Sequence, residues 1–188
     1  LTTFQNSIMS NLCIIPARGG SKRIPRKNIK PFLGKPIIAY SIEAALNSKL
    51  FDEVMVSTDD FEIATIAKKY GASVPFMRSD KTANDFATTF DVIFEVLQKY
   101  ELLNKKFDFS CCIYPCAPFV TKEKLADGFQ VLKENNYDCV FPLIPFSFPI
   151  QRALKENERK VSFFYPEFSL TRSQDLEKSF HDAGQFYW

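Results

Sequence analysis

The residues with the clearest chemical potential form a basic, glycine-rich segment near the start of the chain, Arg18 to Asn28, which reads RGGSKRIPRKN. Glycines allow consecutive backbone N–H groups to turn toward an anion. Six cations between Arg18 and Lys30 would repel one another unless a negative group lay among them. The segment therefore favours a polyphosphate ligand, although its spacing matches neither the Walker A loop nor the GxGxxG fingerprint. A solvated basic loop, or a weak contact with nucleic acid, is the plainer interpretation.

Positive charge is concentrated at this segment rather than spread over the chain. Seven cations precede the first acidic residue, Glu43, while the whole chain of 188 residues carries a net charge of only +2. That balance gives no reason to expect nucleic acid or a membrane surface as a partner. No stretch approaches the roughly 18 apolar residues of a membrane span, and 46% hydrophobic residues suffice for one buried core. We expect one soluble globular domain over residues 9–188.

The elements that must position the basic loop follow from short apolar runs that alternate with helical periodicities. This pattern predicts an α/β fold with a doubly wound, mostly parallel, Rossmann-like sheet. Strands are expected at 12–16, 53–57, 74–77, 109–114 and 139–143. Helices are expected at 35–48, 59–71, 88–103 and 121–136. The basic loop then follows the first strand, at the edge where open parallel sheets bind ligands.

The character of the chain changes near Pro142. Prolines interrupt the sequence, and two polar-apolar strands are expected on either side of Glu156–Glu158. We interpret 142–175 as a small β-rich dimerisation extension, because its phenylalanines are too many for a peripheral hairpin to bury alone. A local satellite core is the alternative. We also take Met9 as the start of the domain, leave residues 1–8 out of the fold, and interpret the aromatic strand pattern at 184–188 as a C-terminal truncation.

The five cysteines are an odd number in mostly apolar contexts, which fits a reducing, cytoplasmic compartment. Cys111, Cys112 and Cys116 with His181 lack the CxxC pairing typical of zinc sites. The pair Asp59 and Asp60 is a second metal candidate. Its position before a helical segment favours helix N-capping, with Asp59 and Glu62 in a capping-box-like arrangement.

The string IIPARGGSKRIPRKNI resembles the signature of cytidylyltransferases that activate nonulosonic (sialic-type) acids, and the likeness continues through KPIIAYSIEAAL, VSTDDFEIA and MRSDKTA. The closing HDAGQFYW, with TRSQDL before it, resembles the pseudaminic acid branch more than the sialic acid branch. The resemblance implies a homodimeric enzyme that uses CTP and Mg²⁺, releases pyrophosphate and forms a CMP-sugar.

Site residues follow from the same resemblance. Lys27 and Arg18 are the implied catalytic residues. The implied CTP ligands are Arg18, Gly19, Gly20, Ser21, Lys22, Lys27, Asn28 and Arg78. The expected sugar ligands are Arg172, Tyr114 and Gln185. The family's metal-binding carboxylates are expected in an Asp-x-Asp segment beyond residue 188, so the metal ligands stay unknown, with Asp182 as a candidate.

Plainer roles remain open for several of these residues. Arg78 has Asp80 as a salt-bridge partner nearby, Asn28 suits a turn, and Arg172 has Asp175. Arg152 is the other candidate for a sugar carboxylate. The segment YPCAP at 114–118 departs from the family's sugar-contacting segment, which puts direct transfer of those contacts in doubt. The alternative functions are a sialic or legionaminic acid synthetase, a cytidylyltransferase for a shorter 2-keto sugar acid, and a non-catalytic nucleotide-binding domain.

Overall fold

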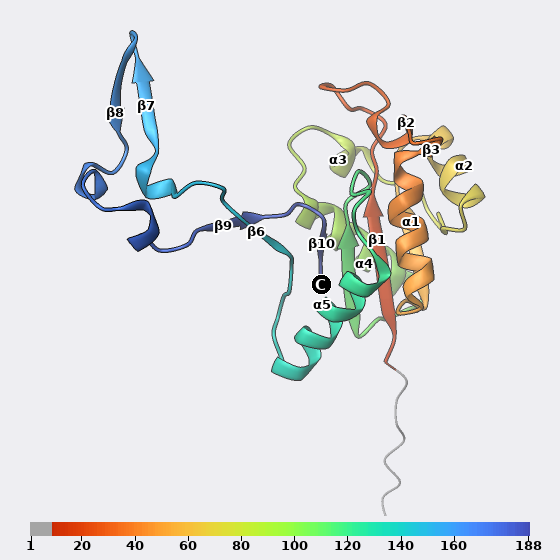
Figure 1. The fold of residues 1–188 in the computed structure, drawn as a ribbon. Helices are drawn as coiled ribbons and strands as arrows, with labels where there is room; N and C mark the ends of the chain where they lie inside the picture. Colours follow the sequence, from red (N-terminus) through yellow and green to blue (C-terminus); the bar gives the residue numbers. More distant parts are fainter. Residues whose placement is uncertain (1–8) are drawn as a thin grey trace, which may run out of the picture. The chain divides into compact units, whose positions relative to one another are not determined.

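The computed structural model describes residues 9–188. Residues 1–8, on which the interpretation of Met9 as the start of the domain depends, lie outside the described residues. The chain divides into two units (Figure 1). The first unit runs to Phe141 and resumes at Gly184–Trp188, and the second is Pro142–Ala183. Among the described residues, no helix combines the length and the apolar character needed to cross a membrane.

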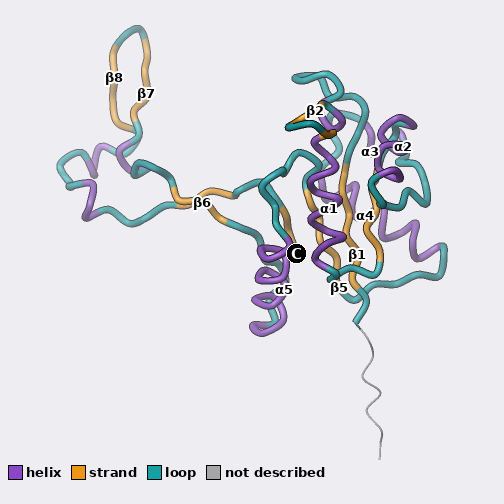
Figure 2. The backbone as a smooth tube through the Cα atoms, turned by 45° about the vertical axis from the view of Figure 1, so that its right-hand side comes forward, coloured by secondary structure: helices purple, strands orange, loops and turns teal. Residues whose placement is uncertain are grey.

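The first unit is built on a four-stranded sheet in the order β10-β5-β1-β4. Figure 2 draws the strands in orange, with β1 and β5 of this sheet labelled. Its strands are β1 (Asn11–Pro16), β4 (Glu53–Ser57), β5 (Phe109–Ile113) and β10 (Phe186–Tyr187). β1 pairs in parallel with both β4 and β5, and β10 pairs antiparallel with β5. The predicted α/β fold with a mostly parallel sheet is confirmed.

Both faces of the sheet are covered, as the alternation along β1 requires. Cys13 and Ile15 point to one face, and Leu12 and Ile14 to the other, and all four are fully buried. The first face packs against α1 (Ile37–Ser48), α2 (Phe61–Lys69) and α5 (Lys122–Asn135). The second face packs against α4 (Thr89–Leu102), which follows the short α3 (Asp80–Ala83).

The last residues of the chain complete the core of the first unit. Trp188 stacks on Phe51 with ring centroids 5.0 Å apart and lies 4.6 Å from the ring centroid of Phe129. Its indole Nε1 donates to the Leu125 carbonyl at 3.0 Å. A Cβ added to Gly128 would lie 3.0 Å from the Phe186 ring, so the helix α5 approaches β10 as closely as a glycine permits.

Two of the predicted strands do not form. Residues 74–77 form no strand: an isolated bridge joins Ser73, just before them, to Met55, and Pro75 has no N–H to extend the ladder. The run 139–143 is not a buried strand either, since Pro142 ends it. Strand β6 (Leu143–Pro145) begins one residue later, in the second unit, and is exposed.

Two other predictions of detail are wrong. Residues Lys35–Pro36 form β3 opposite β2 (Pro31–Phe32), so the first helix starts at Ile37 rather than at 35. The helix predicted at 88–103 ends at Leu102, and Leu103 is its C-cap, 55% exposed to solvent. The N-cap of α5 is Thr121, the first residue of the helix predicted at 121–136. The N-cap of α4 is Thr88, which forms a full capping box with Asp91.

The second unit is small and β-rich. β6 pairs antiparallel with β9 (Phe180–Asp182), and β7 (Leu154–Asn157) pairs with β8 (Lys160–Phe163). Glu158 and Arg159 turn this hairpin with φ of 50° and 65°, the left-handed geometry that matches strand twist. Single 3₁₀ turns connect the strands at Ile150–Arg152, Pro166–Phe168 and Ser173–Asp175. The strand pair expected around Glu156–Glu158 is confirmed.

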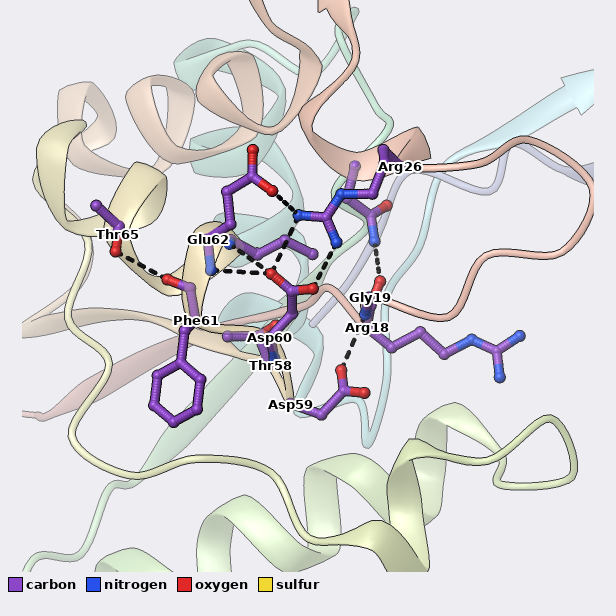
Figure 3. A network of polar contacts seen from close by, with 11 residues as sticks. Arg18, Gly19, Arg26, Thr58, Asp59, Asp60, Phe61, Glu62 and Thr65 are labelled. Carbon is purple, nitrogen blue, oxygen red and sulfur yellow. Dashed lines mark hydrogen bonds and ion pairs between the residues drawn. The ribbon is translucent and has the colours of Figure 1, made fainter.

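The basic loop is clamped to the start of α2 (Figure 3). Arg26, itself left-handed at φ 55°, donates to Asp60 at 2.5 and 3.2 Å and also pairs with Glu62. Asp60 Oδ1 also accepts hydrogen bonds from the amides of Glu62 and Ile63, at 2.9 and 3.0 Å, and so caps α2. Asp60, not Asp59, is therefore the N-cap. A Cβ on Gly19 would lie 2.6 Å from Asp60 Oδ2, so only glycine fits there.

This clamp makes a pH-dependent prediction about stability. The Arg26 hydrogen bond holds the pKa of Asp60 below its usual value. Because the pKa of Asp60 is lower in the folded state than in the unfolded state, its charge stabilises the fold at any pH above the unfolded-state pKa. This contribution is lost as the pH falls through the folded-state pKa. We expect Asp60→Asn, which keeps a capping oxygen, to lower the free energy of unfolding by about 1 kcal/mol at pH 7.

The difference from wild type should shrink as the pH falls below about 4, the ordinary pKa of aspartate in an unfolded chain, and on through the lowered pKa of folded Asp60. Chemical denaturation at pH 7 and pH 3 measures both values. Asp127→Asn, at an exposed position of α5, is the matched control and should cost less at either pH. Equal losses at the two pH values would contradict the role assigned to the carboxylate charge.

Candidate functional site

A pocket of about 490 Å³ opens at the carboxyl ends of β1 and β5 in the first unit. Pro16, the last residue of β1, and Tyr114, which follows β5, form part of its lining. One wall is the basic loop, and the facing wall is the segment between Arg78 and Val92, which includes α3. The position matches the general rule for open parallel sheets, whose ligands bind beyond the carboxyl ends of the strands.

The structure brings most of the sequence-predicted nucleotide ligands to this pocket. Those that line it are Arg18, Ser21, Lys22, Lys27, Asn28 and Arg78, together with Tyr114 from the expected sugar ligands. Gly19 and Gly20 are not among the lining residues; the Gly19 amide donates to Asp59 Oδ1 at 2.9 Å. Gln185 is half-buried, and its backbone carbonyl accepts from the Tyr114 amide at 2.9 Å.

Arg78 is a buried cation held at the end of β4. Its side chain is anchored to Ser57, with Nε 3.1 Å from the hydroxyl and Nη2 2.6 Å from the carbonyl. Burial lowers the pKa of Arg78 to about 10, against the opposing charges of Asp59 and Glu95, so the group stays cationic at neutral pH. Within residues 9–188 it forms no salt bridge with Asp80. Arg78 is thus a fixed positive charge facing the pocket.

Asn28 ties the basic loop to the segment after β5. Its side chain is only 4% exposed. Its Nδ2 donates to the Arg18 carbonyl at 2.9 Å, and its Oδ1 accepts from the Cys116 thiol at 3.4 Å. Both ends of the amide are used within the chain, so Asn28 here supports the shape of the loop, close to the turn-forming role that the sequence left open.

Arg18 and Lys22 meet a carboxylate that sequence reasoning missed. Arg18 donates from Nη1 to the Asn84 carbonyl at 2.8 Å, and its Nη2 lies 2.8 Å from Asp85 Oδ1. Lys22 pairs with the other oxygen, Asp85 Oδ2. The hydrogen bonds from Lys22 and Arg18 lower the pKa of Asp85. Since 66 residues separate Arg18 from Asn84, no local pattern signals this contact.

The wall that carries Asp85 is fixed to α4 by Glu95. This carboxylate accepts from the amide and the hydroxyl of Ser79, each at 2.9 Å, and also from Thr82 and Lys99. Burial raises the pKa of Glu95, but the hydrogen bonds from Lys99, Thr82 and Ser79 outweigh it and lower the value to about 2. The ionised Glu95 therefore holds α3 against α4.

Arg172 and Asp182, predicted for the sugar and the metal, belong to the second unit. Arg172 forms a two-point pair with Asp175, at 2.7 and 3.2 Å, which is the alternative that the sequence left open. Arg152 donates to the Thr171 carbonyl at 2.8 Å. Asp182 is exposed in β9.

The part of the chain that the structure describes does not form a ready metal cage. No group of three or more His, Cys, Asp or Glu residues within 9–188 is arranged to hold a metal ion. The carboxylate that lines the pocket, Asp85, is engaged by two cations. Cys111 and Cys112 are buried in β5, and all five cysteines are free thiols. These residues by themselves do not fit an Mg²⁺ site made by the protein alone.

Comparison with known proteins covers nearly the whole chain. A family model described as Cytidylyltransferase matches residues 12–184. Pseudaminic acid cytidylyltransferase of Campylobacter jejuni is 48% identical over 181 residues, which are 96% of this chain and 78% of that protein. CMP-N,N'-diacetyllegionaminic acid synthase of Legionella pneumophila is 40% identical over 132 residues, 70% of this chain and 57% of that protein.

Among solved structures, CMP:2-keto-3-deoxy-manno-octonic acid synthetase complexed with CTP has a TM-score of 0.66 at 21% identity. The match covers 95% of this chain and 73% of that one, and it concerns the fold. Sequence similarity of this extent, on a fold shared with such a structure, makes the chain a member of the cytidylyltransferase family.

Proposed function

We propose that the chain transfers CMP from CTP to a nonulosonic acid, pseudaminic acid, with release of pyrophosphate. The observation that carries the proposal is the pocket at the carboxyl end of the sheet, which gathers five cations around one cavity. They are Arg18, Lys22, Arg23, Lys27 and Arg78. Such a site suits a nucleoside triphosphate, and the Campylobacter relative supports the choice of sugar.

The chemistry requires positioning more than covalent help from the protein. The anomeric hydroxyl of the sugar attacks the α-phosphorus of CTP in line with the bond to the β-phosphate. A new P–O bond forms, the bond to the leaving pyrophosphate breaks, and the hydroxyl proton is lost. Negative charge shifts toward the pyrophosphate, and in this proposal Lys27 and Arg18, which both line the pocket, stabilise it.

Mg²⁺ remains part of this proposal as a companion of the triphosphate, since phosphate oxygens supply ligands that the described residues do not. The five free thiols support a reducing, cytoplasmic location.

Lys27→Ala tests the nucleotide half of the proposal. Lys27 lines the pocket, and in residues 9–188 no carboxylate pairs with it, so its charge is available to the phosphates. We expect kcat/KM for CTP to fall by about 100-fold or more, with an unchanged melting temperature.

Lys30→Ala is the matched control, because Lys30 is exposed three residues later and lies outside the pocket. Steady-state kinetics and thermal denaturation of the three proteins separate the outcomes. Near wild-type turnover by Lys27→Ala would refute the assignment.

The sugar half is tested with a panel of pseudaminic, N-acetylneuraminic and N,N'-diacetyllegionaminic acids, with CMP-sugar and pyrophosphate measured by mass spectrometry. We expect pseudaminic acid to be preferred by at least about tenfold in kcat/KM. Arg172 is the proposed carboxylate ligand, since a two-point arginine contact like the one to Asp175 suits that group.

Arg172→Ala should then raise KM for the sugar more than KM for CTP. A preference for the legionaminic acid would favour the alternative represented by the Legionella relative. Binding of CTP with no pyrophosphate from any acid would favour a non-catalytic nucleotide-binding domain.

We further propose that the second unit makes a homodimer. Several of its large apolar side chains are exposed in the single chain, including Phe148 at 61%, Phe164 at 56% and Leu170 at 96%. Apolar surface of this kind is typical of interface cores. Light scattering at tens of micromolar should give twice the chain mass of 21.6 kDa, and Phe148→Asp should shift it toward the monomer. A monomeric wild-type mass would overturn the assignment.

A further inference from the structure

The carboxylate of Asp85 stands apart within the pocket. Among the described residues that line it, five are cations and Asp85 is the only acid. Its two oxygens are divided between the cations, Oδ1 to Arg18 at 2.8 Å and Oδ2 to Lys22. A phosphate group bridges two basic side chains in the same way, with one oxygen on each. Asp85 thus forms ion pairs with two of the cations that a triphosphate would need.

The turn that carries Asp85 is held at both ends. Asn84 Oδ1 accepts from the amides of Phe86 and Ala87 at 2.8 and 3.0 Å, and Asn84 Nδ2 donates to the Lys81 carbonyl at 2.7 Å. On the other side, Thr88 and Asp91 form the capping box of α4. Because these contacts do not involve Asp85, the carboxylate can leave Arg18 and Lys22 without dismantling the wall.

The strength of the contact is compatible with exchange. The side chains of Arg18 and Asp85 are 31% and 32% exposed, and that of Lys22 is 79% exposed. Ion pairs with this much access to water are individually weak and are screened by salt. A triphosphate, which carries more charge and also reaches Lys27 and Arg78, can displace a single carboxylate from both partners.

We propose that Asp85 is a built-in competitor for the phosphates of CTP beyond the α-phosphorus. It holds Arg18 and Lys22 when the pocket is empty, gives them up to CTP, and reclaims them as pyrophosphate leaves. This rests on the proposed function. The competition lowers the affinity for the two ligands that need Arg18 and Lys22, namely CTP and pyrophosphate. It leaves the affinity for CMP unchanged. Its consequence for the reaction is easier release of the pyrophosphate product.

The test is calorimetric titration of CTP, inorganic pyrophosphate and CMP into the wild type and Asp85→Asn. We expect the variant to bind CTP and pyrophosphate about three- to tenfold more tightly, and CMP within about twofold of wild type. Product inhibition by pyrophosphate should become stronger by a similar factor. Asp85→Ser, which also removes the charge, should behave in the same way, and thermal melts verify that both variants fold.

Asp80→Asn is the matched control, because it makes the same change in net charge at an exposed residue outside the pocket. It should leave all three affinities unchanged. Weaker CTP binding by Asp85→Asn would mean that Asp85 positions the cations instead of competing for them, and equal affinity would mean that it does neither. A similar gain in affinity for CMP would mean that removing one negative charge favours any anionic ligand, without specific competition for Arg18 and Lys22. Each of these results overturns the proposal.

Failure of the proposed function is distinguishable from failure of this inference. A wild-type chain that binds pyrophosphate but not CTP would contradict the nucleotide proposal. The competition by Asp85 would still be measured by the pyrophosphate titrations of wild type and Asp85→Asn.

Discussion

Mutual repulsion among the cations of one short loop is the constraint on which the rest of the site depends. Like charges this close destabilise a fold unless opposite charges or a ligand compensate them. The structure supplies two compensating groups from different parts of the chain. Asp60 and Glu62 neutralise Arg26, and Asp85 neutralises Arg18 and Lys22 in part. The loop can therefore fold before any nucleotide binds, and part of its positive charge stays uncompensated.

Rigid supports fix each wall of the pocket separately. The basic loop is fixed to α2 through Asp60, where the close approach of Gly19 leaves no room for a side chain. The opposite wall is fixed to α4 through Glu95 and to β4 through the contacts of Arg78 with Ser57. Because both walls are attached to elements that belong to one sheet or pack on it, the distances among their cations are set by the core and not by the ligand.

Sequence reasoning succeeded where the signal is local. The first strand, the basic loop after it and the start of α5 at Thr121 each follow from residues within one turn or one strand. It failed where a proline outweighed an apolar run, as at 74–77, and it placed the cap of α2 one residue early. Adjacent aspartates give the same signal, and only packing against Gly19 and Arg26 decides that Asp60 caps the helix.

The pocket residues that no pattern indicated share one property, which is that their partners lie far away in sequence. Asn84 meets Arg18 across 66 residues, and the Cys116 thiol meets Asn28 across 88. Such contacts exist only once the sheet has brought the segments that follow β1, β4 and β5 to one edge. The position of the basic loop after the first strand was enough to place its cations at this edge. The groups that restrain those cations depend on tertiary structure and required the fold.

The cations of the basic loop differ in how many carboxylates neutralise them, and the least neutralised ones lie nearest the cavity. Arg26, behind the loop, has two carboxylates to itself, while Arg18 and Lys22 share one. Lys27 lines the pocket and has no carboxylate partner within residues 9–188. The uncompensated charge thus increases from the α2 side toward the cavity. A polyanion entering the pocket gains most from the groups nearest the cavity, and the cations that shape the loop are the ones it does not need to disturb.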